Sequence, residues 1–87
     1  MFKKAYFRVS EVSKDVASNK KAVIATDFFG RKMSGFFDDS YIRKGQLEVK
    51  TVQEEGDTVL VMCPGEGFLE QDRYITVCKY DIEYPKD

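Results

Sequence analysis

This chain of 87 residues contains no histidine, and its longest apolar run, residues 59–63, is only five residues long. Histidine is the side chain that most often serves in acid–base catalysis near neutral pH and in zinc ligation, so its absence argues against both roles. A run of five apolar residues is far too short to cross a bilayer. Residues 1–8 lead into no apolar segment of the signal-peptide type. We therefore expect no membrane span and no exported precursor.

Cysteine is also scarce, and the only two residues of this type are Cys63 and Cys78. Two cysteines make no disulfide framework, and without histidine they cannot complete a structural zinc site within one chain. Cys63 shares its alternation with Val59 and Val61, which predicts a thiol that faces the core. If the last two strands pair across the loop after Cys63, Cys78 lies opposite Thr58, too far from Cys63 for a bridge. We expect two reduced thiols and a cytoplasmic location.

The net charge is −1, which favours neither a polyanion nor a membrane surface as partner. Residues 1–32 carry eight basic and three acidic groups, whereas residues 33–87 carry six basic and twelve acidic groups. This asymmetry creates faces of opposite sign unless the fold interleaves the two halves. The carboxylate pairs fall in predicted turns, and no calcium-binding or phosphate-binding motif is present. We predict no catalytic residue, no metal site and no cofactor.

What the sequence does contain is an alternation of apolar and polar residues with a period of two. We predict a single domain over residues 1–87 that is all-β, or β-rich α+β with one short helix or an ordered loop within residues 10–19. Six strands and two tight hairpins favour a small antiparallel barrel, SH3-like or OB-like. The strand candidates are residues 4–9, 21–29, 32–37, 47–53, 57–63 and 73–84.

Turn residues set the expected register of both hairpins. A two-residue turn at Gly30-Arg31 places Phe28 opposite Met33 and gives β-strand 21–29 a core face of Ile24, Thr26 and Phe28. A three-residue loop over residues 54–56 places Val49 opposite Val61. Residues 59–63 are apolar on both faces, which indicates a central strand. The final strand changes parity near residues 78–79, where we expect a bulge.

One segment combines aromatic and basic residues in a pattern typical of binding surfaces. The predicted register places Phe29 and Phe36 on the non-core face with Lys32 between them and Arg31 at the tip of the hairpin. A second buried layer over both rings is the alternative. Tyr and Phe beside Arg are typical of protein interfaces, and the same mixture stacks nucleic-acid bases. The candidate binding residues are Phe29, Arg31, Lys32, Phe36, Tyr41 and Arg43.

These observations lead to a functional hypothesis with one runner-up. The leading interpretation is a non-catalytic protein-interaction module, such as a regulator, an inhibitor or an accessory subunit, whose partner is another protein. The alternative is a single-stranded nucleic-acid-binding protein of OB-like type, against which the net charge counts. An enzyme ranks third, because neither a motif nor a suitable base is present.

Overall fold

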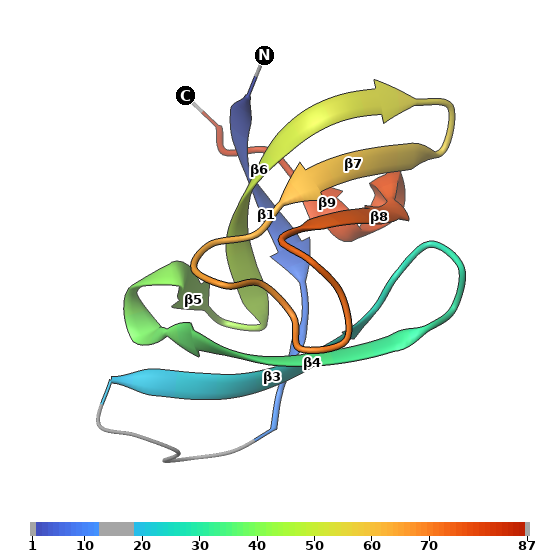
Figure 1. The fold of residues 1–87 in the computed structure, drawn as a ribbon. Helices are drawn as coiled ribbons and strands as arrows, with labels where there is room; N and C mark the ends of the chain where they lie inside the picture. The colour runs from blue at the N-terminus through green and yellow to red at the C-terminus, as the bar shows by residue number, and fades with distance from the viewer. Residues whose placement is uncertain (1, 13–18, 87) are drawn as a thin grey trace.

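The computed structural model describes residues 2–12 and 19–86, which fold into two antiparallel sheets without an α-helix (Figure 1). This confirms the expectation of an all-β protein. The short helix considered within residues 10–19 lies mostly outside the described residues, and Ser10 and Glu11 at its start belong to a strand. The strands are β1 (Lys3–Arg8), β2 (Ser10–Glu11), β3 (Lys20–Thr26), β4 (Lys32–Asp38), β5 (Ile42–Arg43), β6 (Gln46–Glu55), β7 (Thr58–Met62), β8 (Tyr74–Cys78) and β9 (Ile82–Glu83).

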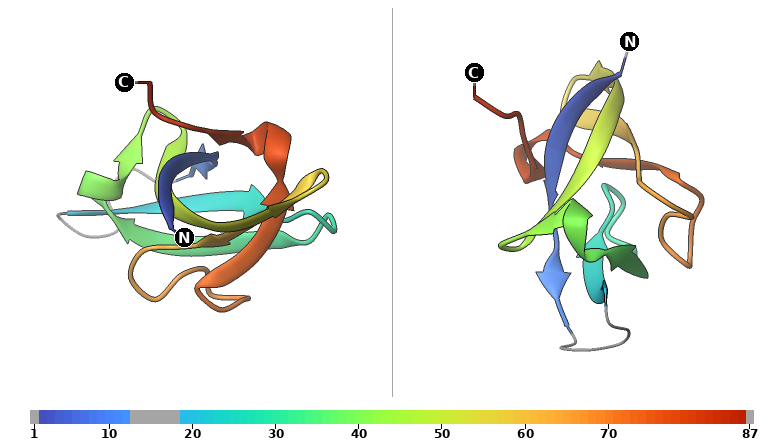
Figure 2. Two further views of the ribbon diagram at one scale, coloured as in Figure 1. Left: turned by 90° about the horizontal axis from the view of Figure 1, so that it is seen from above. Right: turned by 90° about the vertical axis from the view of Figure 1, so that its left-hand side faces the viewer.

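The larger sheet has the strand order β8-β7-β6-β1-β9, with β5 also paired to β6, and the smaller sheet has the order β2-β3-β4. The chain passes from the larger sheet to the smaller one between β1 and β2, as both further views show (Figure 2). At this crossing, the Val9 N–H donates to the Gly45 carbonyl oxygen at 2.9 Å. Neither sheet closes on itself through the described residues, so the SH3-like or OB-like barrel remains a prediction.

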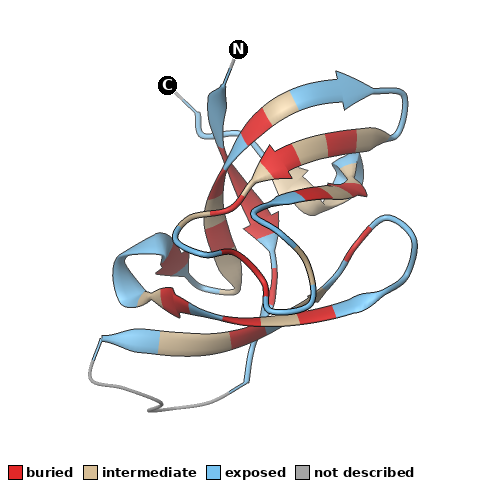
Figure 3. Ribbon diagram, in the orientation of Figure 1, coloured by how far each residue is buried: buried red, intermediate tan, exposed pale blue. Residues whose placement is uncertain are grey.

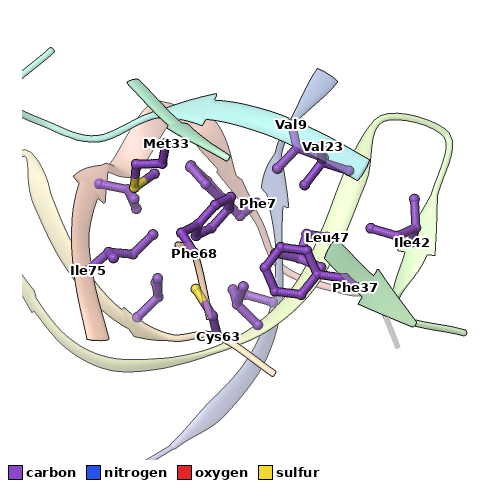
Figure 4. Close-up of a cluster of buried hydrophobic side chains, with 14 of the residues drawn as sticks. Phe7, Val9, Val23, Met33, Phe37, Ile42, Leu47, Cys63, Phe68 and Ile75 are labelled. Atoms are coloured by element: carbon purple, nitrogen blue, oxygen red, sulfur yellow. The ribbon is translucent and has the colours of Figure 1, made fainter. Parts of the chain in front are cut away.

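Both sheets contribute to one hydrophobic core, and buried residues alternate with less buried ones along β4, β7, β8 and the first part of β6 (Figure 3). The segment between β7 and β8 adds Phe68, which lies in the middle of this core (Figure 4). The Phe68 ring packs edge-on against Phe37 at 5.1 Å between centroids and against Phe7 at 6.5 Å. The loop that carries Phe68 is therefore anchored between the two sheets.

The β6–β7 hairpin has the predicted faces but a different register. Val61 lies opposite Thr51, two positions from its predicted partner Val49. Because the shift is even, the predicted core residues still face inward and are buried. The loop contains two residues, with Gly56 at φ +60°, and the ladder shifts once between Thr51 and Gln53. Glycine at the first position of a two-residue loop favours the tight turn, and the bulge absorbs the extra residue.

The predicted register of the β3–β4 hairpin is wrong. Met33 lies opposite Ala25, not Phe28, and the connection covers residues 27–31 instead of two residues. The shift is odd, so β3 turns Val23 and Ala25 toward the core and exposes Ile24. The longer turn forms because a buried Asp27 side chain holds it, an interaction that turn rules based on glycine do not include.

The β7–β8 pairing confirms the register expected from the sequence. Cys78 lies opposite Thr58, and the cysteines are not bonded to each other. Cys63 is fully buried, and burial raises the pKa of its thiol to about 12. The predicted last strand over residues 73–84 is divided: a 3-10 turn, η2 (Lys79–Asp81), stands in place of the expected bulge, and Ile82 packs against the core whereas Tyr80 and Tyr84 are exposed. This turn directs the chain from β8 to β9, which pairs with β1.

Candidate functional site

The turn between β3 and β4 is built around the carboxylate of Asp27, whose side chain is 1% exposed. This carboxylate accepts hydrogen bonds from the backbone N–H groups of Phe29 and Arg31, both at 2.9 Å. It also accepts from Arg31 Nε at 2.9 Å and from Gln71 Nε2 at 2.8 Å. Burial raises the pKa of Asp27, but the hydrogen bonds from Arg31 and Gln71 outweigh it and hold the pKa below its usual value.

Three of the predicted binding residues lie at this turn. Phe29 is 67% exposed and packs edge-on against Phe28, with ring centroids 5.4 Å apart. The Arg31 guanidinium lies 5.6 Å from the Phe29 ring centroid while its Nε bonds to Asp27. The charge of Arg31 is therefore already paired within the turn. Lys32 is exposed at the start of β4.

Phe36 is also exposed, at 46%, but it lies four residues along β4 from Lys32. At about 3.3 Å per residue, this separation is roughly 13 Å. The predicted arrangement also placed Phe29 within the strand that pairs with β4, and this part is wrong, because β3 ends at Thr26 and Phe29 lies in the turn. The candidate residues instead divide into a group at the turn and a group around Phe36.

Around Phe36, the outer face of the smaller sheet is apolar. Phe36 lies opposite Ala22 on β3, and the N–H of Val12 donates to the carbonyl oxygen of Ala22 from the other side. Ile24 is the next outward residue of β3. Leu69, which is 69% exposed, joins this face because its N–H donates to the Ser34 carbonyl oxygen at 2.7 Å. We call this surface the outer apolar face; it consists of Val12, Ala22, Ile24, Phe36 and Leu69.

Beside the outer apolar face, a hollow of about 390 Å³ lies between β4 and the loop that follows β7. We call it the β4 groove. Its lining includes the aromatic rings of Phe36 and Tyr41, and Pro64 and Leu69 from the loop. Tyr41 belongs to the 3-10 turn η1 (Asp39–Tyr41), which directly follows β4. The structure thus brings Phe36 and Tyr41 of the predicted site to one groove.

The loop is fixed next to β4 by a second carboxylate, that of Glu70. Its two oxygens accept from the Ser34 N–H and the Ser34 hydroxyl, both at 2.7 Å. These hydrogen bonds lower the pKa of Glu70. Together with the hydrogen bond from the Leu69 N–H, these two hydrogen bonds join the loop to the edge of β4 at Ser34. The wall of the β4 groove is therefore held by polar contacts as well as by Phe68 in the core.

Arg43 does not line the β4 groove. Its guanidinium lies over the Tyr6 ring, 4.1 Å from the centroid, on the larger sheet. Tyr6 is almost completely buried, so Arg43 covers a ring that would otherwise face solvent. This contact explains the orientation of Arg43 by packing alone.

Two members of the outer apolar face, Ile24 and Leu69, were not expected to be there. Ile24 was assigned to the core by the incorrect β3–β4 register. Leu69 follows Phe68 in an irregular segment, where no periodicity indicates which of two neighbouring apolar residues turns outward. Its only sequence signal is that Phe68 and Leu69 are adjacent, since in an extended segment adjacent side chains point to opposite sides.

No group of three or more Asp, Glu or Cys side chains among the described residues is placed to hold a metal ion. The charges of the two halves of the chain are interleaved, as the Lys4–Glu48, Arg8–Asp81 and Lys21–Asp39 ion pairs show. Opposite charges of the two halves thus meet in these three pairs.

The exposure of Phe29 leads to a direct prediction. We expect Phe29→Ala to lower the free energy of unfolding by less than about 1 kcal/mol, because the side chain is mostly exposed. A thermal melt measures this effect. A loss of about 3–5 kcal/mol, as for a core aromatic, would contradict the observed position of the ring.

Comparison of this chain with models of known protein families, with curated proteins and with solved structures finds no match. The part of the chain that the structure describes also has no helix with the length and apolar character needed to cross a membrane. The function is therefore argued from the residues of the outer apolar face and the β4 groove.

Proposed function

We propose that this protein is a non-catalytic protein-interaction module, a regulator, inhibitor or accessory subunit, that binds its partner through the outer apolar face and the β4 groove. One observation carries this proposal: Phe36 and Leu69 are exposed side by side next to Tyr41. Contiguous apolar side chains on a small domain, with an aromatic residue at the centre and polar groups at the rim, are typical of protein interfaces. Phe36 is the central residue of this interface.

We also propose that the two sheets form a partly open barrel related to the SH3-like or OB-like type. The crossing of the chain at Val9 supports this, because it leads directly from β1 of the larger sheet to β2, an edge strand of the smaller sheet. The contact of Leu69 with Ser34 and the contact of Phe28 N–H with the Thr76 carbonyl oxygen link the opposite edges. The free thiols Cys63 and Cys78 agree with a reducing compartment such as the cytoplasm.

A single-stranded nucleic acid is the weaker candidate for the partner. Such ligands need a basic groove with rings on which successive bases stack. Here Arg31 is paired with Asp27, and the β4 groove holds the carboxylates of Asp38 and Glu66 against one cation, Lys20. The balance of charge therefore supports a protein partner.

The proposal is tested by site-specific photocrosslinking in living cells. A photoreactive residue is placed at Leu69, and a control carries it at Tyr80, which is 72% exposed in η2 and outside the groove. We expect one defined protein adduct from position 69 and none from position 80. Phe36→Ala, added to the first variant, should weaken the purified complex about thirtyfold, since a hot-spot aromatic contributes about 2 kcal/mol.

Thermal melts of the same variants provide the control for folding. Phe36→Ala should lower the free energy of unfolding by less than about 1 kcal/mol, because its ring is half exposed. Equal adducts from positions 69 and 80 would contradict the proposed interface. Adducts with RNA or DNA that disappear steeply with added salt would favour the nucleic-acid alternative.

A further inference from the structure

The outer edge of β4 is hydrogen-bonded at Ser34 and open at Phe36. In an antiparallel pair, residues alternate between those bonded to the partner strand and those whose groups point away from it. The backbone groups of Ser34 point away from β3, since its C=O accepts from the Leu69 N–H and its N–H donates to the Glu70 carboxylate. Phe36 is two positions further along, so its N–H and C=O also point away from β3.

The partner of Phe36 on β3 confirms this direction. Ala22 lies opposite Phe36, and the carbonyl oxygen of Ala22 accepts from Val12 on the far side of β3. The Ala22–Phe36 pair is therefore one that exchanges no hydrogen bonds. Among the described residues, none bonds to the N–H or C=O of Phe36. One donor and one acceptor of a sheet edge thus face the β4 groove.

The size of the β4 groove suits a short stretch of added strand. Strands in a sheet lie about 4.8 Å apart, rise about 3.4 Å per residue and occupy a layer about 10 Å thick. Two residues of an extra strand therefore need roughly 330 Å³. The groove offers about 390 Å³. Tyr41 and Leu69 line the same groove.

An open sheet edge next to exposed apolar side chains is a feature that proteins normally cover. In this chain the Glu70 carboxylate and the Leu69 N–H cover the edge at Ser34, while the edge at Phe36 is left open. We infer that an extended peptide segment of a protein partner enters the β4 groove and adds as a strand to the edge of β4 at Phe36. This inference rests on the proposed function and specifies its binding mode.

The side chains around the groove indicate the chemistry of this segment. The peptide residue opposite Phe36 stands on the same face as the Phe36 and Leu69 side chains, which favours an apolar side chain at that position. Lys20 lies opposite Asp38 across the two strands, whereas Glu66 has no ion pair among the described residues. A lysine or arginine near the apolar residue would complement Glu66. The expected ligand is an extended peptide with an apolar residue and a nearby basic one.

The inference is tested with random dodecapeptides displayed on phage and selected on the full chain. The tightest peptide is synthesised and its affinity is compared for Phe36→Ala and Phe36→Pro. Alanine removes the ring and keeps the N–H; proline removes both, and it leaves the β3–β4 hydrogen bonds intact because the Phe36 N–H takes no part in them. We expect Phe36→Ala to weaken binding about tenfold and Phe36→Pro at least tenfold more.

Hydrogen exchange on the unmodified chain provides a second measurement that needs no variant. The Phe36 amide should exchange rapidly in the free protein and at least tenfold more slowly with the peptide bound. The amides of Gly35 and Phe37, which are already in the ladder, serve as internal controls and should not change. N-methylation of the peptide residue that bonds to Phe36 should abolish this protection.

The possible failures are distinguishable. Equal affinities of Phe36→Ala and Phe36→Pro for the peptide, with an unchanged Phe36 amide, would overturn strand addition and leave the apolar interface in place. A selection that enriches no peptide would also overturn strand addition. Failure of the proposed function appears elsewhere, as crosslinking from position 69 that does not differ from position 80.

Discussion

Replacing Phe68 by alanine is expected to lower the free energy of unfolding by about 3–5 kcal/mol. Phe68 is fully buried and packs edge-on against Phe7 and Phe37, although it comes from a loop and not from a strand. Its removal leaves a cavity where both sheets meet. In a small domain with a total stability of about 5 kcal/mol, this loss removes most of the folding free energy.

A urea titration or a thermal melt measures this effect, with a drop in melting temperature on the order of 15–25 °C. Leu69→Ala is the matched control, because it truncates the adjacent residue in the same loop. Leu69 is 69% exposed, so its truncation should cost less than about 1 kcal/mol. Similar losses from the two variants would contradict the view that the buried Phe68 side chain, and not the exposed Leu69 side chain, anchors the loop in the core.

The second large effect is expected at Asp27. We expect Asp27→Ala to lower the free energy of unfolding by about 2–4 kcal/mol, because it removes a buried carboxylate and leaves the partly buried donors of Phe29, Arg31 and Gln71 without their acceptor. Asp39→Ala is the control: that carboxylate is exposed and takes part in a surface ion pair with Lys21. Its loss should cost less than about 1 kcal/mol. Chemical denaturation at neutral pH measures both variants.

The pH dependence of stability separates the contribution of the ionised Asp27 carboxylate from the contribution of its packing. The folded state lowers the pKa of Asp27, so its ionised form stabilises the fold. That contribution is fully present above the unfolded pKa of about 3.9 and is lost as the pH falls through the lower folded value. The stability of the parent should therefore fall more steeply than that of Asp27→Ala below about pH 4. If stability fell with pH in parallel for the parent and for Asp27→Ala, the charge of Asp27 would not contribute to stability.

Much of the strand pattern was predictable because apolar alternation reports directly on burial. The central position of β7 and the pairing of Thr58 with Cys78 followed from residues 59–63 and from the loop that returns to β8. The β3–β4 register was not predictable in this way. It depends on the Asp27 carboxylate and on Gln71, which is distant in the sequence and joins the turn only after folding.

The candidate site was predictable in part. Phe36 and Tyr41 were chosen for their residue type and do line one groove, whereas Phe29 lies apart and Arg43 covers Tyr6. The outward position of Leu69 depends on Phe68 entering the core and on Glu70 bonding to Ser34. Contacts of this kind join segments that no local pattern relates. The open edge at Phe36 is likewise a property of strand pairing and not of any residue type.

The position of β1 in the larger sheet has a consequence for how the chain is made. β1 lies between β6 and β9, so both of its neighbours come later in the sequence. A ribosome releases β1 first, and the inward face that contains Ala5 and Phe7 stays without a partner while the rest is synthesised. The larger sheet is therefore complete, with β9 paired to β1, only after translation has passed residue 83. Folding limited by such distant strand pairing is expected to take milliseconds to seconds.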